Sequence, residues 1–497
     1  MRPFLLAALL ILGCAHDPRP PPVQGWRELR STHFRLRTDL PEDPARTTLE
    51  KLETLRWWLQ AAWSTGGDSP GVSNAIVLDQ PAELRTFTTM PGIATTARDG
   101  PLLVTAGTET VFGDRSPWVQ ILAHEVAHEL IRRRMPGAPR WFHEGLAGYL
   151  QTVVALDDHR VRFGFSPLDP SDPQGSLTSP ALLPPRNLLS LDETASRNWE
   201  TAPGEALSDL YLSARLWVSL LRTEEPVRMR ALEAALASGT SWRRAWDDLR
   251  RGLDVGRLQE KLWRLLQSGG WTSELRAFAP LPPAALRARS ERLLAPWEVH
   301  LALADLWTMA ARIRVSETSG PRARAELEAA VAAAPDEPVA LVRLAELEPD
   351  PDLRRGRAEA LVQRFPDSPE ARVFLARVLR DDGGPVEGRR EAALAAVTAA
   401  PDSVDAQTAH AIEELRSGNA SGALRSLARA EQLEPWNPAV FVSRAVVLGA
   451  IGQCAQAVDT VQRALDVLPD DPPLTDVRTL IQERDRISRT CRSRTGP

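Results

Sequence analysis

Hydrophobic residues follow strand and helix spacings in turn along the first hundred residues. Polar and apolar side chains alternate around Phe34 and Leu36, which predicts a half-buried strand. Leucine and tryptophan then recur every three or four residues, as on one face of a helix. The predicted elements are, in order, a strand within 26–39, a helix over 45–63, a strand over 75–78, a helical turn over 81–87 and a strand over 102–104. This order of alternating strands and helices leads into a further helix after residue 117.

A stronger helical pattern begins after Pro117, which suits a first-turn position and follows the possible cap Ser116. The apolar positions of this helix are Val119, Leu122, Val126 and Leu130. A turn rich in proline and glycine separates it from a second helix that contains Glu144. Further along, we expect a strand over 160–165, a long loop over 166–185, a helix over 205–221 and helices over 227–266.

The C-terminal part of the chain repeats with a period near 34 residues. Prolines recur at Pro335, Pro366, Pro401, Pro435 and Pro469. Small residues of the last two units also stand 34 apart, Ala411, Gly418, Ala423 and Ala430 matching Ala445, Gly452, Ala457 and Ala464. Small side chains at fixed positions let paired helices approach closely. The period resembles that of tetratricopeptide (TPR) repeats, which implies four or five helix pairs in a superhelix whose concave face binds protein.

The first helix after Pro117 carries the motif His124-Glu125-x-x-His128. Residues i and i+4 lie on the same face of a helix, so both imidazoles can reach one metal ion. Glu125 lies at the edge of that face, where a carboxylate can hold a water molecule and take its proton. This is the spacing of a zinc site.

A catalytic zinc ion takes three protein ligands and keeps one position open. Glu144, on the next predicted helix, is the best candidate for the third ligand. The intervening Pro136, Gly137 and Pro139 can turn the chain back. Gly145, Ala147 and Gly148 are small, so we expect the second helix to pack closely on the first.

HEVAHEL followed by PRWFHEGLAGYL resembles the paired motifs of the gluzincin zinc metallopeptidases, most closely the peptidase-MA-like lipoprotein group. The resemblance implies that His124, His128 and Glu144 are zinc ligands and that Glu125 is the general base. It also implies a small sheet beside the active-site helix, with an edge strand along the substrate cleft. The metzincin pattern requires histidine at position 134, which is Arg134. Glu129 departs from the gluzincin motif, in which this residue is usually uncharged.

Two further residues near the motif have open roles. Tyr211 lies in the 205–221 helix, and the resemblance implies that its hydroxyl stabilises the oxyanion; a core aromatic whose hydroxyl meets the surface is the alternative. His143 could be a fourth ligand of a purely structural zinc site, since such sites have four protein ligands. An adjacent Glu144 and a glutamate at position 125 argue against that alternative.

Composition limits the classes of partner. The net charge is −5 and the hydrophobic fraction is 43%, as in ordinary globular proteins. No basic surface for nucleic acid is expected from this balance. The two resemblances given above imply protein partners for the repeats and a peptide or protein substrate for the first domain.

The N-terminus predicts export. Arg2 precedes a short apolar core, too short to span a bilayer, and the run ILGC ending at Cys14 resembles a bacterial lipobox. Lipidated Cys14 would anchor the protein to a membrane in the cell envelope, at the outer membrane or on its periplasmic side; an ordinary secretory signal with an incidental cysteine is the alternative. An oxidising compartment would also permit a bridge between Cys454 and Cys491, or both thiols could be unpaired.

We therefore predict an α+β zincin-like metallopeptidase domain followed by an all-α TPR-like solenoid. The predicted parts are a signal peptide at 1–13, a proline-rich tether at 14–25, the peptidase domain at 26–268, a linker at 269–294 and the repeats at 295–490. The expected function is zinc-dependent peptide hydrolysis by an exported, lipid-anchored protein. The alternative is a TPR scaffold lipoprotein whose zinc-binding domain cleaves nothing.

Overall fold

The structure is a computed structural model of the chain, and it describes most residues between 20 and 466. The described residues are 20–63, 71–88, 92–97, 100–107, 117–157, 159–164, 189–197, 204–268, 271–280, 286–313, 315–382, 385–466, 481–482, 484–487 and 489. The predicted signal peptide and Cys14 lie outside them, as does Cys491. Cys454 is disulfide-bonded. Within the described residues, no helix is both long and apolar enough to cross a membrane.

The N-terminal half is built on a mixed six-stranded sheet with the order β4-β5-β3-β2-β1-β9. Strands β2, β3 and β5 run parallel, whereas β4, β1 and β9 are antiparallel to their neighbours. Strand β4 therefore forms one edge of the sheet. The strands are β1 (Arg27–Arg30), β2 (Phe34–Thr38), β3 (Ser73–Leu78), β4 (Gly92–Ala97), β5 (Gly100–Ala106) and β9 (Ser290–Leu293).

Two of these strands differ from the sequence prediction. The single strand predicted within 26–39 is a hairpin of β1 and β2, closed by a hydrogen bond from the Ser31 amide to the Phe34 carbonyl. Strand β4 has the sequence GIATTA, without alternating large apolar residues, and the pattern did not predict it. Edge strands need less apolar surface than central strands, because only one side is paired.

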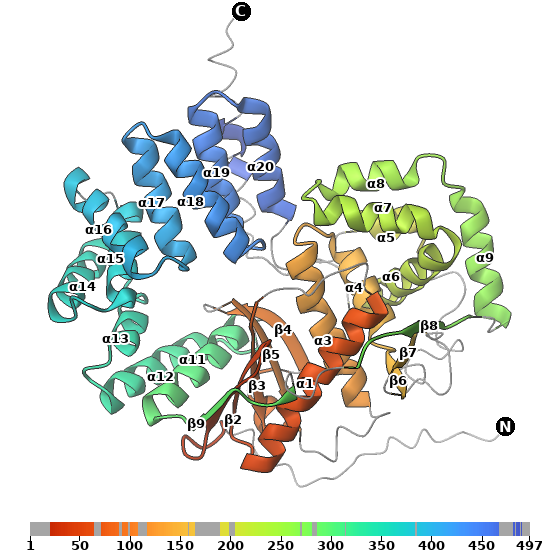
Figure 1. Cartoon of the computed structure of the whole chain (residues 1–497), viewed down its shortest axis with the longest axis horizontal. Helices are drawn as coiled ribbons and strands as arrows, with labels where there is room; N and C mark the ends of the chain where they lie inside the picture. Colours follow the sequence, from red (N-terminus) through yellow and green to blue (C-terminus); the bar gives the residue numbers. More distant parts are fainter. Residues whose placement is uncertain are drawn as a thin grey trace, which may run out of the picture.

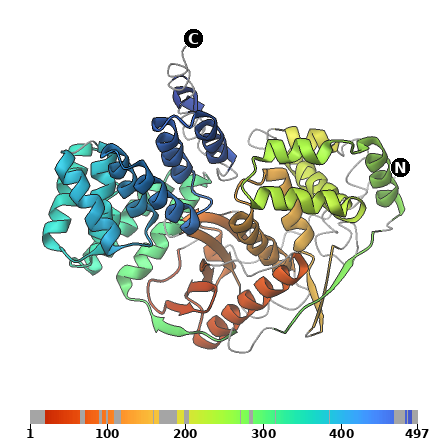
Figure 2. The ribbon, with the colours of Figure 1, turned by 45° about the horizontal axis from the view of Figure 1, so that its top comes forward.

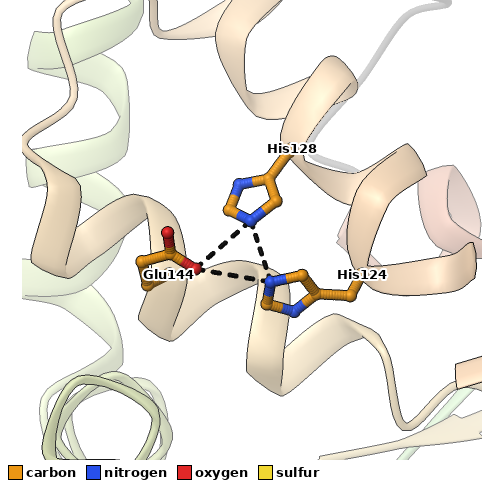
Figure 3. A group of neighbouring side chains, drawn as sticks. All are labelled: His124, His128 and Glu144. Atoms are coloured by element: carbon orange, nitrogen blue, oxygen red, sulfur yellow. Dashed lines mark hydrogen bonds and ion pairs between the residues drawn. The ribbon is translucent and has the colours of Figure 1, made fainter. Parts of the chain in front are cut away.

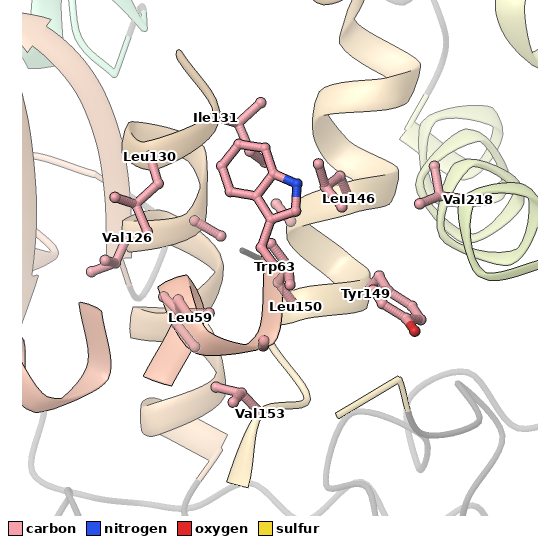
Figure 4. Close-up of a cluster of buried hydrophobic side chains, with 14 of the residues drawn as sticks. Leu59, Trp63, Val126, Leu130, Ile131, Leu146, Tyr149, Leu150, Val153 and Val218 are labelled. Atoms are coloured by element: carbon pink, nitrogen blue, oxygen red, sulfur yellow. The ribbon is translucent and has the colours of Figure 1, made fainter. Parts of the chain in front are cut away.

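Helices cover both faces of the sheet (Figure 1). On one face, α1, α3 and α4 form the main core, and Figure 4 shows Leu59, Val126 and Leu146 meeting there from these three helices. On the other face, Ile76 and Val104 pack against Leu303 of α11. The helices of this half are α1 (Glu42–Trp63), α2 (Pro81–Leu84), α3 (Pro117–Arg134), α4 (Arg140–Leu150), α5 (Leu191–Ser196), α6 (Gly204–Glu224), α7 (Pro226–Ala237), α8 (Trp242–Arg250) and α9 (Val255–Ser268).

Helix α4 lies very close to α6, and glycine makes this possible. A methyl carbon at Gly145 would overlap the carbonyl oxygen of Ala214 and lie 2.6 Å from a methyl carbon of Val218. Gly148 faces the side chain of Arg215, which also lies on α6. These two glycines were expected to bring α4 onto α3, and that expectation was wrong. The two glycines instead let α6 approach α4 closely, on a different side of α4 from α3.

The segment 269–294, predicted to be a linker, contributes to two sheets instead. Strand β8 (Glu274–Ala277) completes a small sheet with β6 (Val154–Asp157) and β7 (Arg160–Phe163), in the order β6-β7-β8. Strand β9 pairs with β1 in the main sheet. Both strands are short and largely exposed, so they lack the apolar pattern that would have predicted them.

The C-terminal half is an array of paired antiparallel helices of the TPR kind (Figures 1 and 2). Gly418 and Gly452, 34 residues apart, each lie in the turn between the two helices of one pair, α17–α18 and α19–α20. Their φ angles are +84° and +82°, a conformation that glycine adopts without strain. The helices are α11 (Pro296–Arg312), α12 (Ser319–Ala333), α13 (Pro338–Ala345), α14 (Pro351–Arg364), α15 (Pro369–Asp382), α16 (Val386–Ala399), α17 (Val404–Arg416), α18 (Ala420–Leu433), α19 (Pro438–Ala450) and α20 (Cys454–Asp466).

The array is joined to the sheet domain at both of its ends. At its start, Arg37 of β2 contacts Asp305 of α11 at 3.4 Å. At its end, the Arg133 guanidinium of α3 lies 5.1 Å from the centre of the Trp436 ring, between α18 and α19. The Arg463 side chain of α20 also lies beside Gly239, which follows α7. The repeats therefore arch away from the sheet and return to the helix that carries the histidine motif.

The packing of α4 on α6 leads to a stability prediction. Gly145→Ala should lower the free energy of unfolding by about 1–3 kcal/mol, because the new methyl group meets backbone that cannot yield without moving a helix. Gly148→Ala is the matched control: its methyl group would lie 3.3 Å from the flexible Arg215 side chain, so we expect a change below about 1 kcal/mol. Urea denaturation of both variants measures the difference, and equal stabilities would contradict the proposed contact.

Candidate metal centre

Helix α3 presents two histidines to one point. His124 and His128 are one turn apart, and their Nε2 atoms lie 2.8 Å from each other. Their ring planes are nearly perpendicular, at 86°. Figure 3 shows both Nε2 atoms directed toward the same carboxylate on the neighbouring helix. This is the face that the i, i+4 spacing predicted.

The carboxylate is that of Glu144, in the first half of α4. Its Oε2 atom lies 3.3 Å from Nε2 of His124 and 3.3 Å from Nε2 of His128. Ligand atoms around a tetrahedral zinc ion, with bonds of about 2.0–2.1 Å, are about 3.3 Å apart. Among the described residues, these three are the one group of histidine, cysteine and acidic side chains placed to share a metal ion.

Burial and charge oppose each other at Glu144. The side chain is 5% exposed, and burial alone would favour its neutral form. Electrostatic interaction with the His128 imidazole and hydrogen bonding from the two histidines outweigh that effect and hold the pKa of Glu144 well below its usual range. Oε2 is nevertheless buried without a well-formed hydrogen bond. A buried carboxylate oxygen between two imidazoles is thus placed to meet a cation.

The other ring nitrogens of the two histidines also have partners. His124 Nδ1 lies 2.8 Å from Oε1 of Gln151, which directly follows α4. His128 Nδ1 lies 2.9 Å from Nδ1 of His143. Gln151 and His143 are 3% and 4% exposed, so both contacts are shielded from solvent.

His143 is therefore not placed as a fourth ligand. It contacts the Nδ1 side of the His128 ring, away from Nε2, and its own ring lies nearly parallel to that of His128, with 5.2 Å between the ring centres. Burial and positive charge on His128 and Arg132 lower the pKa of His143 well below the ordinary value, which favours a neutral ring.

Glu125 points to the sheet rather than into the group of three. Its Oε2 accepts a hydrogen bond of 2.6 Å from the backbone amide of Ala94 in β4. Ala94 belongs to the edge strand β4, and its amide is engaged by the Glu125 side chain on α3. Glu125 and His128 also line a pocket between α3 and the sheet, together with Ala94, Thr95 and Leu103.

Tyr211 of α6 reaches the group through one intermediate residue. The Arg140 guanidinium donates to the Tyr211 hydroxyl oxygen at 3.1 Å, and its Nε lies 3.8 Å from Oε1 of Glu144. The hydroxyl is thus linked to Glu144 through Arg140. The other tyrosine, Tyr149, is buried and donates to Glu274 of β8, so it joins α4 to the small sheet.

Three contributors to this site were not identified from the sequence: Ala94, Arg140 and Gln151. Ala94 acts through its backbone, which no side-chain pattern reveals. Gln151 had a usable signal, because it stands seven residues after Glu144, two helical turns on, and is polar in an otherwise apolar stretch. Arg140 also had one, since it lies four residues before Glu144 on the same helix.

Comparison with known proteins finds similarity in the fold alone. No protein-family model matches the chain, and no curated protein sequence matches it. Among solved structures, a thermophilic TPR protein from Thermus thermophilus is 18% identical, with 39% of this chain and 98% of that chain covered and a TM-score of 0.30. The MamA protein is 14% identical over 34% of this chain and 91% of its own, with a TM-score of 0.25. Yeast Tom70 is 12% identical over 74% of each chain, with a TM-score of 0.27. The TPR interpretation rests on the 34-residue period and the paired helices of the array, and the candidate metal centre on its own geometry.

Proposed function

We propose that this chain is a zinc-dependent peptidase whose helical array binds protein partners or substrates. The observation that carries the catalytic part is the convergence of His124, His128 and Glu144, with Glu125 next to His124 on the same helix. The observation that carries the binding part is the array itself, because stacked helix pairs form an extended surface of the kind that binds protein.

The three side chains fit a zinc ion by their chemistry as well as by their spacing. Two imidazole nitrogens and one carboxylate oxygen form a ligand set used by catalytic zinc, with a fourth position left open. Oε2 of Glu144 is buried without a well-formed hydrogen bond, and a metal bond would satisfy it. Gln151 and His143 hold the outer ring nitrogens, as outer partners do around metal-bound histidines.

When bound, zinc would polarise the scissile carbonyl and lower the pKa of a water molecule. Glu125 would accept the proton of that water and pass it to the leaving amine. The hydrogen bond from the Ala94 amide orients the Glu125 carboxylate while leaving its second oxygen for this task. Tyr211, linked to Glu144 through Arg140, would donate a hydrogen bond from its hydroxyl to the developing oxyanion.

The edge strand suggests how a peptide would lie. Strand β4 is an edge strand whose Ala94 amide meets Glu125, so an extended peptide added to that edge would pass near the carboxylate. Backbone pairing of this kind selects an extended conformation and not a particular sequence. The substrate class is therefore an unfolded or loop segment of a protein.

We also propose export and lipid anchoring through Cys14, on the N-terminal sequence alone. The protein would then act in the cell envelope, tethered to a membrane by the lipid. Radiolabelled palmitate should enter the wild-type chain in a bacterial host and should not enter Cys14→Ser. Incorporation into both would contradict lipidation at this residue.

A non-catalytic scaffold is the second candidate, and the array favours it. Stacked helix pairs can bind partners without any chemistry at the histidine motif. In this function the repeats bind partners and the metal centre only stabilises the sheet domain. The scaffold cannot be tested by deleting all the repeats, because α11 covers one face of the sheet. Substitution of Glu125 separates the two functions without that damage.

Glu125→Gln should abolish peptide hydrolysis while retaining zinc. We expect turnover to fall at least about 10²-fold, because glutamine cannot accept the proton, and about one zinc per chain to remain. Metal analysis together with cleavage of an unfolded protein substrate measures both quantities. Glu50→Gln, exposed on α1, is the charge-matched control and should behave as wild type. If Glu125→Gln keeps full activity, this mechanism is wrong; if it complements a deletion strain fully, the scaffold function is favoured.

Glu144→Ala should lose the metal. Removing one of three ligands leaves two imidazoles, which we expect to weaken zinc binding by more than the roughly 10–100-fold typical of outer-partner changes. Zinc affinity is measured by competition with a coloured chelator, and the melting temperature of the metal-free variant serves as the folding control. Wild-type affinity in Glu144→Ala would remove this residue from the ligand set.

A further inference from the structure

We propose that His143 is a positioning residue that holds the His128 ring in the orientation required for metal binding, and that Gln151 does the same for His124. This inference rests on the metal centre proposed above and adds the residues that prepare it. It also gives His143 a definite role, in place of the fourth-ligand role considered from the sequence.

The positions of the protons on the two imidazoles decide which ring nitrogens can bind a metal ion. A neutral imidazole has one N–H group, and a nitrogen that binds a metal cannot carry it. The Nε2 atoms of His124 and His128 face Glu144 and each other, so they are the metal-binding atoms. Each ring must then carry its proton on Nδ1. A buried N–H group needs an acceptor, and the structure supplies one for each ring.

Gln151 supplies the acceptor for His124. Its Oε1 atom lies 2.8 Å from His124 Nδ1, a normal length for an N–H···O hydrogen bond. Gln151 follows α4 directly and is 3% exposed, so its amide is buried against the His124 ring. The amide oxygen can only accept, so this contact selects the tautomer of His124 with the proton on Nδ1.

His143 supplies the acceptor for His128. The two Nδ1 atoms are 2.9 Å apart, so one of them donates and the other accepts. If His128 carries its proton on Nδ1, His143 must accept there and carry its own proton on Nε2. A histidine at position 143 therefore accepts the hydrogen bond without carrying a charge. A carboxylate at this position could also accept the hydrogen bond, but it would add a negative charge beside Glu144.

Both positioning residues belong to the same short segment as the third ligand. His143 precedes Glu144 and Gln151 follows it by seven residues, so one segment brings the ligand and both acceptors to α3. The segment is held against α6 by the contact at Gly145. Packing of one helix thus sets the position of all three groups at once.

The test compares variants of His143 that keep or remove the acceptor, in the full-length protein. In His143→Asn, the amide oxygen takes the place of Nδ1, so zinc affinity should stay within about threefold of wild type. In His143→Phe, the ring remains without an acceptor, and zinc affinity should fall about 10–100-fold. Competition with a coloured chelator measures zinc affinity, and metal-free melting curves show whether each variant folds. His143→Leu replaces the Phe variant if the latter does not fold.

Two variants of Gln151 provide an independent test. Gln151→Glu keeps an acceptor and should bind zinc at least as tightly as wild type, whereas Gln151→Met, similar in shape, should lose about 10–100-fold in affinity. Absorption of the cobalt-substituted protein reports the ligand set directly. We expect all four folded variants to keep the wild-type spectrum, because none of them removes a ligand.

Three outcomes would overturn the proposal. Equal zinc affinity in His143→Phe, His143→Asn and wild type would show that the acceptor has no effect. A changed cobalt spectrum in both His143 variants would make His143 a ligand and not a positioning residue. Absence of zinc binding by the wild-type chain would overturn the proposed metal centre, and this inference with it. If the wild-type chain binds zinc and the variants do not behave as expected, only the positioning roles of His143 and Gln151 are overturned.

Discussion

The close contact between α4 and α6 at Gly145 is the constraint on which the candidate metal centre depends. Glu144 is the residue before that glycine, so the separation of the two helices sets the depth at which its carboxylate meets α3. Any larger side chain at position 145 would push against the backbone of Ala214. The glycine therefore helps to position the site, although it has no side chain that could bind a metal ion. Helix α6 also carries Tyr211, so the same contact places the hydroxyl relative to Glu144.

The carboxylate of Glu144 is buried in the group that it forms with His124 and His128, so it costs free energy unless a cation is close to it. The same burial makes the group well suited to binding a cation. Two imidazoles and a carboxylate lie within hydrogen-bonding range of each other, and the outer nitrogens of both rings are already engaged by Gln151 and His143. A buried charged group needs a partner of opposite charge. Glu129, the departure from the gluzincin motif, has its own partner: it pairs with Arg133, which in turn lies against Trp436 of the repeats. The unusual glutamate thus belongs to the junction between the two halves of the protein, on the same helix as the histidines.

Sequence reasoning was most successful where a short period determines geometry. The i, i+4 spacing of His124 and His128 placed both on one face, and the 34-residue period predicted the helix pairs of the array. Glu144 was named because it stood on the next helix, and the structure brings its carboxylate to the two histidines. Strands β8 and β9, within the segment predicted to be a linker, and strand β4 were missed because short exposed or edge strands carry little apolar pattern. The expected docking of Gly145 and Gly148 on α3 was wrong because spacing tells which residues share a face, and not which neighbour that face meets.

The sequence by itself determined the local geometry: the helix that presents two imidazoles, the carboxylate close behind it and the repeating helix pairs. These features follow from contacts between residues a few positions apart, for which backbone periodicity suffices. Only the tertiary structure decided that Ala94 of β4 holds Glu125, that His143 meets Nδ1 of His128, and that the last repeats return to α3. Those contacts join segments that are brought together by packing of the whole domain, and the free energy that selects them is shared among many residues, so no short motif encodes them.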